Sequence, residues 1–270
     1  MKSGWRLQIV IDPVILLTIN VSTTMKLIRF ILILLISNGA YALPKGFVYL
    51  QQVDPSILQE MRYAGEHNFV GRPIRGYKTA SCILSTQAAM ALSAVQRELK
   101  KHSLTLKVYD CYRPVMAVAD FAAWSKDSGQ QQMKQEFYPN INKRDVFRLG
   151  YVAAQSGHSR GSAVDLTIAP LPTPSSATYI KGQRLIACTA VYNQRFRDNS
   201  IDMGTGYDCL DKQAHTYNVK PGSAAYHNRM SLRSIMIKNG FEPYEKEWWH
   251  FSLAHEPYPH TYFDFAVQGK

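Results

Sequence analysis

The sequence predicts a single α+β domain that follows an N-terminal leader. Three observations favour this class. Segments with helix and strand periodicity follow one another along residues 43–270, no internal repeat is present, and no linker divides these residues convincingly into two domains. The chain has 270 residues, 46% of them hydrophobic, which is enough to bury one substantial core.

The first half of the domain contains two predicted helices with a strand between them. The clearest helix covers residues 86–101, where apolar side chains share one face and basic side chains lie at the C-terminal end. Residues 104–109 alternate as a β-strand does. Arg113-Pro114 then begins a helix that runs to about Lys126, since proline is tolerated in the first turn of a helix.

The second half adds strands and a last helix. A strand around Asp165 follows a loop, and residues 170–176 form a surface stretch rich in proline and serine. A helix is predicted over about 226–239, because Gly240 fits the position just after a helix end. An aromatic-rich strand from Phe241 to Phe251 is predicted to close the fold.

Residues 1–42 are predicted to be a leader, with a secretory signal peptide at residues 25–42. A basic start is followed by an apolar segment from Phe30 to Ile36 and then by Ala40-Tyr41-Ala42, which suits signal peptidase. The apolar segment is too short to span a membrane. We therefore expect cleavage after Ala42, a periplasmic or secreted protein, and no stable membrane insertion afterwards. Residues 1–24 are either an over-extended start or part of a longer leader or anchor.

The charge of the chain does not indicate a nucleic-acid partner. The formal net charge is +11 at pH 7, but the basic residues are scattered and form no ladder with aromatic residues. Attraction to anionic envelope polymers is the milder interpretation of this excess.

Four cysteines follow the predicted signal, at positions 82, 111, 188 and 209. An even number after an export signal favours disulfides over metal binding, and none of the spacings is Cys-x-x-Cys. Four cysteines allow three connectivities. The pairing that we favour joins Cys82 to Cys111 and Cys188 to Cys209.

Two separated segments contain the side chains of a catalytic zinc site. Residues 156–165 supply His158 and Asp165, and residues 247–250 supply Glu247 and His250. Such a site needs three protein ligands, a position for water and a general base. In an extended strand, Asp165 lies on the face opposite its neighbours, so we expect it to point into a cleft while they pack in the core.

Several motifs that span nearly all of residues 43–270 resemble the VanX-type D-alanyl-D-alanine dipeptidases. This zinc peptidase group, peptidase M15, also holds D-Ala-D-Ala carboxypeptidases and the hedgehog signalling domain. The resemblance implies a central antiparallel sheet flanked by helices, with the zinc site in a cleft on the sheet. The matching segments are Tyr109–Pro114, Tyr138–Ile141, Gly150–Thr167, Leu232–Met236, Glu247–His250, Glu256–Pro259 and Tyr262–Phe265.

The same resemblance implies the roles of individual residues. His158, Asp165 and His250 would bind one zinc ion per chain, and Glu247 would be the general base. The adjacent Trp248-Trp249 pair favours a partly desolvated site, where the pKa of a carboxyl rises.

Further residues are implied to stabilise the transition state and to select the substrate. Arg113 would stabilise the negative charge on the former carbonyl oxygen. Asp208 would accept the free ammonium of a dipeptide, and Tyr63 and Ser156 would line the pocket.

The implied activity is hydrolysis of D-Ala-D-Ala to two D-alanine molecules. Two alternatives remain: a D,D-carboxypeptidase or endopeptidase acting on longer peptidoglycan peptides, and a non-catalytic zinc-binding module. The segment from about Ala169 to Ser200 is longer than the usual hairpin of the family, which predicts an extended loop near the cleft and leaves the pocket size open. Gly157 occupies a position often held by serine. The sequence also leaves the oligomeric state and the physiological role open.

Overall fold

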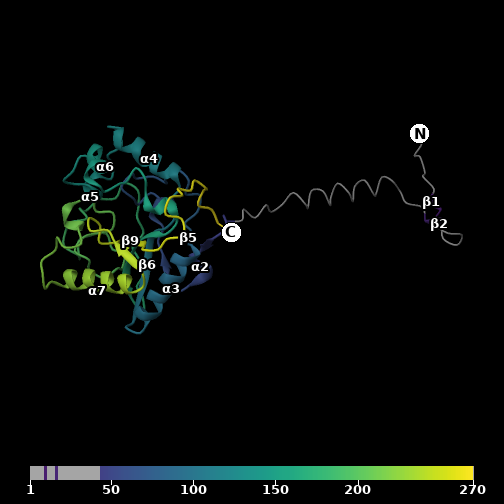
Figure 1. Ribbon diagram of the computed structural model, residues 1–270. Helices are drawn as coiled ribbons and strands as arrows, with labels where there is room; N and C mark the ends of the chain where they lie inside the picture. The colour runs from purple at the N-terminus through teal and green to yellow at the C-terminus, as the bar shows by residue number, and fades with distance from the viewer. Residues whose placement is uncertain (1–8, 11–15, 18–42, 270) are drawn as a thin grey trace. The chain divides into compact units, whose positions relative to one another are not determined.

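The computed structural model describes residues 9–10, 16–17 and 43–269. In the N-terminal part, β1 (Ile9–Val10) and β2 (Leu16–Leu17) form an antiparallel pair. Residues 43–269 form one compact unit (Figure 1). The signal peptide predicted at residues 25–42 lies outside the described residues, and its cleavage stays a prediction.

A five-stranded sheet forms the centre of the compact unit. Three of its four pairings are antiparallel, but β4 and β6 are parallel, so the expectation of an antiparallel sheet is wrong at one edge. The strands lie in the order β4 (Leu58–Gln59), β6 (Leu104–Asp110), β7 (Ala163–Pro170), β9 (His250–Leu253) and β8 (Phe241–Pro243).

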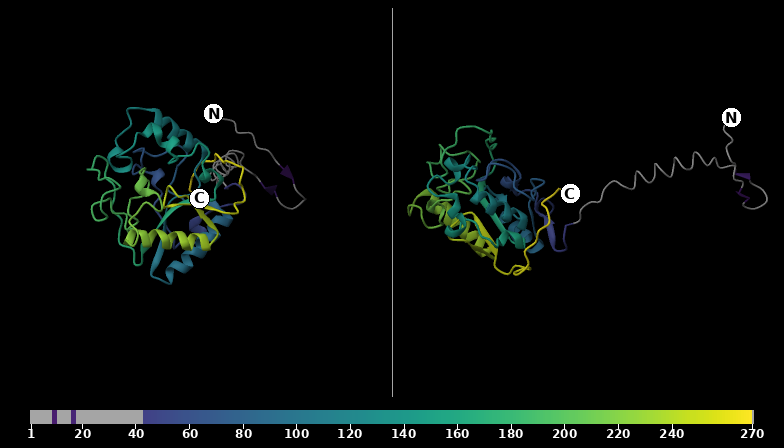
Figure 2. Two further views of the ribbon diagram at one scale, coloured as in Figure 1. Left: turned by 60° about the vertical axis from the view of Figure 1, so that its left-hand side comes forward. Right: turned by 90° about the horizontal axis from the view of Figure 1, so that it is seen from above.

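Helices cover the sheet on two sides. Figures 1 and 2 show α3 (Thr86–Lys100) and α7 (Ala224–Lys238) on one side, and α4 (Val115–Lys126) on the other with two short helices. The short elements of the described chain are α2 (Leu50–Val53), α5 (Lys134–Phe137), α6 (Val146–Leu149), the 3-10 turns η1 (Arg62–Ala64), η2 (Lys143–Asp145), η3 (Gly157–Arg160) and η4 (Lys212–Ala214), and the strand pair β3 (Phe47–Tyr49) and β5 (Ile83–Ser85).

The long helices and the strand β6 form where local sequence signals predict them. The helix α3 begins after Ser85, whose hydroxyl accepts a hydrogen bond from the backbone N–H of Ala88. The helix α4 begins directly after Pro114, as expected. The helix α7 ends before Gly240, which has the positive φ of +88° that favours glycine after a helix end.

The strand predicted over residues 241–251 is wrong, because the structure divides it into β8 and β9. Pro243 ends β8 and has no N–H with which to continue the ladder. The N–H of Tyr244 then donates to the carbonyl of His250, which closes a turn between the strands. This turn contains Glu247 and brings it close to His250.

Both expected disulfides are present. Cys82 is joined to Cys111 with an S–S distance of 1.97 Å, and Cys188 is joined to Cys209 with one of 2.05 Å. Of the surface stretch predicted at residues 170–176, Pro170 still belongs to β7, whereas residues 171–176 are mostly exposed and contain no helix or strand, as their composition predicts. Among the residues that the structure describes, no helix has the length and apolar character needed to cross a bilayer.

Candidate active site

One cavity of about 200 Å³ collects all the side chains that the sequence singles out. It lies on the sheet face opposite the core that Val164 and Leu166 share with α3 and α7. Segments more than 180 residues apart in the chain meet there. The expected site residues that line it are Tyr63, Arg113, Ser156, His158, Asp165, Asp208, Glu247 and His250.

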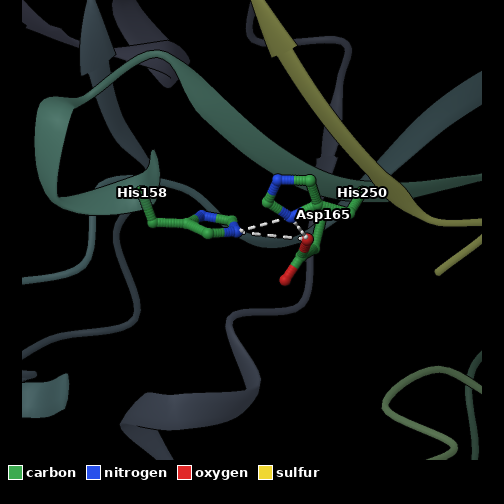
Figure 3. A group of neighbouring side chains, drawn as sticks. All are labelled: His158, Asp165 and His250. Carbon is green, nitrogen blue, oxygen red and sulfur yellow. Dashed lines mark hydrogen bonds and ion pairs between the residues drawn. The ribbon is translucent and has the colours of Figure 1, made fainter. Parts of the chain in front are cut away.

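His158, Asp165 and His250 line this cavity, and their side chains point toward one another (Figure 3). Strand pairing explains part of this geometry, since Asp165 on β7 is the direct partner of His250 on β9. The Nδ1 atom of His250 lies 3.0 Å from Asp165 Oδ1 and 3.0 Å from His158 Nε2. The distance between His158 Nε2 and Asp165 Oδ1 is 3.2 Å. All three side chains are at least largely buried.

The hydrogen bond made by His158 leaves its Nε2 atom, when the ring is neutral, with an electron pair directed at the other two side chains. His158 Nδ1 lies 2.7 Å from the carbonyl oxygen of Cys111, which can only accept, so this nitrogen carries the hydrogen and Nε2 has a lone pair. His250 Nε2 lies 3.4 Å from the hydroxyl of Ser252. Two nitrogen acceptors and a carboxylate oxygen at such short distances could hold a metal ion.

The ionisation of the triad fits this interpretation. Burial opposes ionisation of Asp165, but the two imidazoles hold the pKa of its carboxyl below the ordinary value. Burial also lowers the pKa of His250 and so favours the neutral, metal-binding form of its ring.

Glu247 lies in the β8–β9 turn and is buried at the cavity wall, with 8% of its surface exposed. Its Oε2 atom is 4.0 Å from Nδ1 of His250. Burial raises the pKa of Glu247 well above the ordinary value, and the nearby carboxylates of Asp165 and Asp208 raise it further. A carboxyl in this environment exchanges its proton at a higher pH than an ordinary glutamate does.

Arg113 follows β6 and is buried with its guanidinium braced on several sides. Its Nε and Nη2 atoms lie 2.9 and 2.8 Å from Asp110 Oδ2, and Nη2 lies 3.6 Å from Asp165 Oδ2. The aromatic rings of Tyr63 and Phe121 pack against the guanidinium. The charge of Arg113 is therefore fixed at the edge of the triad.

Two supporting residues have no assigned role in the sequence analysis. Asp110 is fully buried between Arg113 and the hydroxyl of Tyr77, which donates to it over 2.6 Å. Tyr207 donates a hydrogen bond of 3.1 Å to Asp165 Oδ2, the oxygen that faces away from the imidazoles. One feature of the sequence could have indicated the role of Asp110: its carboxylate lies three residues before Arg113 in the same motif.

Asp208 and Tyr63 also line the cavity and contact each other. The Tyr63 hydroxyl donates to Asp208 Oδ2 over 2.9 Å. Burial, together with the charge of Asp165, raises the pKa of Asp208 to about 8. Ser156 also lines the cavity, and its hydroxyl accepts a hydrogen bond from the backbone N–H of His158 at the start of η3.

The segment 169–200, which the sequence analysis expects to be an extended loop near the cleft, contributes none of the described lining residues, so it does not set the cavity volume directly. Its covalent link to the site is the disulfide between Cys188 and Cys209, the residue after Asp208. The six histidines outside the motifs also lie away from the described lining: His67, His102, His215, His227, His255 and His260.

A buried His–Asp–His triad beside a carboxylate and a fixed guanidinium is the arrangement of a metal-dependent peptidase. The chain belongs to peptidase family M15, because the family model described as D-Ala-D-Ala dipeptidase matches residues 44–174 and 169–268. The protein is therefore a peptidase, of a family of metalloenzymes.

Curated relatives agree with this membership. A D-alanyl-D-alanine dipeptidase of Streptomyces coelicolor is 37% identical over 224 residues, which cover 82% of this chain and 98% of the relative. One from Enterococcus faecalis is 35% identical over 222 residues, which again cover 82% of this chain and 98% of the relative. One from Escherichia coli is 29% identical over 206 residues, covering 76% of this chain and 83% of the relative.

Proposed function

We propose that the protein hydrolyses D-Ala-D-Ala to two D-alanine molecules with one bound zinc ion. The observation that carries this proposal is the convergence of all eight expected site residues on one cavity of about 200 Å³. Pockets for drug-sized ligands usually measure about 300–1,000 Å³. The small volume supports a dipeptide substrate rather than a longer peptidoglycan peptide.

The donor set of the triad fits zinc. His158 would bind through Nε2, His250 through Nδ1 and Asp165 through Oδ1, since these atoms face one another at 3.0–3.2 Å. When bound, zinc lowers the pKa of water to about 7 and polarises the scissile carbonyl. The carbonyl of Cys111 keeps the His158 ring in the tautomer that can bind.

Glu247 would act as the general base and then as a general acid. Its carboxylate takes a proton from the attacking water and delivers it to the leaving amine. The raised pKa of the buried Glu247 carboxyl suits both steps, because the group must gain and lose a proton in one turnover.

Arg113 would stabilise the oxygen on which negative charge develops. The ion pair with Asp110 fixes the guanidinium in advance, so little reorganisation is needed during the reaction. Asp110 is thus a positioning residue in this proposal.

Asp208 would recognise the free ammonium of the substrate. An ammonium group next to Asp208 favours the ionised carboxylate and offsets the cost of burying it. The predicted signal peptide and the two disulfides support a periplasmic or secreted location.

An assay of D-alanine release tests the proposal. Purified protein is incubated with D-Ala-D-Ala and, separately, with a pentapeptide that ends in D-Ala-D-Ala. We expect release from the dipeptide, loss of release with a chelator and recovery with added Zn²⁺. Preference for the pentapeptide, or activity that resists metal removal, would contradict the proposal.

A further inference from the structure

Asp208 has a backbone conformation that needs support from its surroundings. Its φ of +55° lies in the left-handed region, which aspartate adopts at an energetic cost. Its side chain is buried and accepts a hydrogen bond from Tyr63. Tyr63 restrains the carboxylate but not the peptide backbone, so another restraint must hold the segment.

The Cys188–Cys209 disulfide supplies that restraint directly after Asp208. Next to the disulfide, the N–H of Gly206 donates to the carbonyl of Cys188 over 2.9 Å. The cross-link and this hydrogen bond thus enclose Asp208 from both sides in the sequence. Both half-cystines are buried, with no more than 3% of either exposed.

Both arms of this cross-link are attached to the helix α5. The N–H of Cys188 donates to the carbonyl of Glu136, and the N–H of Leu210 donates to the carbonyl of Phe137, each over 2.8 Å. The disulfide therefore ties two neighbouring chain segments to each other and to one helical turn. Without the disulfide, the segment before Leu210 would lose its covalent attachment to Cys188.

The metal triad is held by different contacts. His158 is oriented by the carbonyl of Cys111, and Asp165 and His250 are paired across β7 and β9. Neither Cys188 nor Cys209 is among the described residues that line the cavity. The one hydrogen bond from this segment to the triad comes from Tyr207, and it reaches the Asp165 oxygen that faces away from the imidazoles.

We propose that the Cys188–Cys209 disulfide is a positioning element that fixes Asp208 and thereby sets the selectivity for peptides with a free amino terminus. This inference rests on the proposed dipeptidase function. The cross-link acts on recognition of the substrate ammonium and leaves metal binding and the chemical step in place.

The test compares the zinc-loaded wild-type protein with C188S/C209S, and with C188A/C209A, which keeps the buried site apolar. The substrates are D-Ala-D-Ala and its N-acetylated form. We expect KM for the free dipeptide to rise about tenfold to a hundredfold, since small misplacements of a binding group have effects of this size. The kcat should change by less than about twofold, the zinc content should stay the same, and the preference for the free dipeptide should fall as its KM rises.

A double-mutant cycle separates positioning from a general loss of structure. In a D208N background, breaking the disulfide should cause no further rise in KM, because the group that it positions is already altered. The matched control C82S/C111S removes the other disulfide and should lower zinc affinity without changing the preference. Additive effects of C188S/C209S and D208N on KM, or an unchanged preference, would overturn the inference.

Hydrogen exchange gives a readout that does not depend on activity. The amides of Gly206 and Leu210 should exchange at least about tenfold faster in C188S/C209S, while the amides around His158 keep their protection. Unchanged exchange at residues 206–210 would overturn the inference even if the wild type does not cleave the dipeptide. A wild type that cleaves no dipeptide counts against the proposed function alone.

Discussion

Replacing Asp208 by asparagine should stabilise the metal-free protein and impair catalysis. The pKa of Asp208 is raised to about 8 by burial, against roughly 3.9 in an unfolded chain. This difference of roughly four powers of ten in proton affinity corresponds to about 5 kcal/mol of lost stability at high pH. Asparagine has no charge to bury and can still accept the hydrogen bond from Tyr63.

The sign of the pH dependence follows from the raised pKa. The folded protein holds the Asp208 proton more tightly than the unfolded chain, so this contribution to stability is complete below about pH 4 and is lost as the pH rises to about 8. The advantage of Asp208→Asn should therefore grow over this interval. Urea unfolding of chelator-treated protein at pH 5 and pH 8.5 measures it, and taking the difference between variant and wild type cancels the other titrating groups.

Catalysis by the same variant should change in the opposite direction. Loss of a buried charge that pairs with the substrate ammonium should lower kcat/KM about 30-fold or more, the equivalent of about 2 kcal/mol. A stability difference that stays constant between the two pH values would refute the assignment of a buried, neutral carboxyl. Unchanged kcat/KM would refute its role in recognition.

Three further variants test the other parts of the site. Glu247→Gln should lower kcat by about 10²–10⁴ with zinc still bound, as metal analysis can check. A kcat equal to that of the wild type would exclude Glu247 as the general base. Arg113→Ala should lower kcat by about 10²–10³ and also retain zinc, whereas a parallel loss of metal would indicate a structural role. Replacing Cys82 and Cys111 by serine should weaken zinc binding about tenfold or more in competition with a chromophoric chelator, because the Cys111 carbonyl orients a proposed ligand; unchanged affinity would argue against this support.

Local signals in the sequence were sufficient for the long helices and for the strand that contains Asp165. The helix α3 has an apolar face and a capping serine at Ser85, and α7 stops at Gly240, so both ends depend on residues inside or next to the helix. The alternation of residues along the strand correctly predicted that Asp165 faces the cavity while Val164 packs in the core, because side chains on successive strand residues point to opposite faces.

Features that depend on distant contacts could not be predicted in this way. The β8–β9 turn depends on a hydrogen bond between Tyr244 and His250, and the parallel pairing of β4 depends on where residues 58–59 meet β6. A β-bulge between Val108 and Asp110 places Asp110 opposite Asp165. No periodicity in the sequence records this shift, although it brings the partner of Arg113 to the site.

The electrostatics of the cavity support the proposal that one site binds both a metal ion and an ammonium group. Asp165, Asp208 and Glu247 line it, and in the described lining Arg113 is the single fixed cation, already paired with Asp110. Burial and mutual repulsion raise the pKa values of Asp208 and Glu247, so ionising these carboxyls is unfavourable in the empty cavity. A divalent cation at the triad would lower this cost, and a substrate ammonium next to Asp208 would lower it further. An N-blocked peptide would not offset the cost of ionising Asp208, so the environment that disfavours this carboxylate in the empty site would favour a substrate with a free amino terminus.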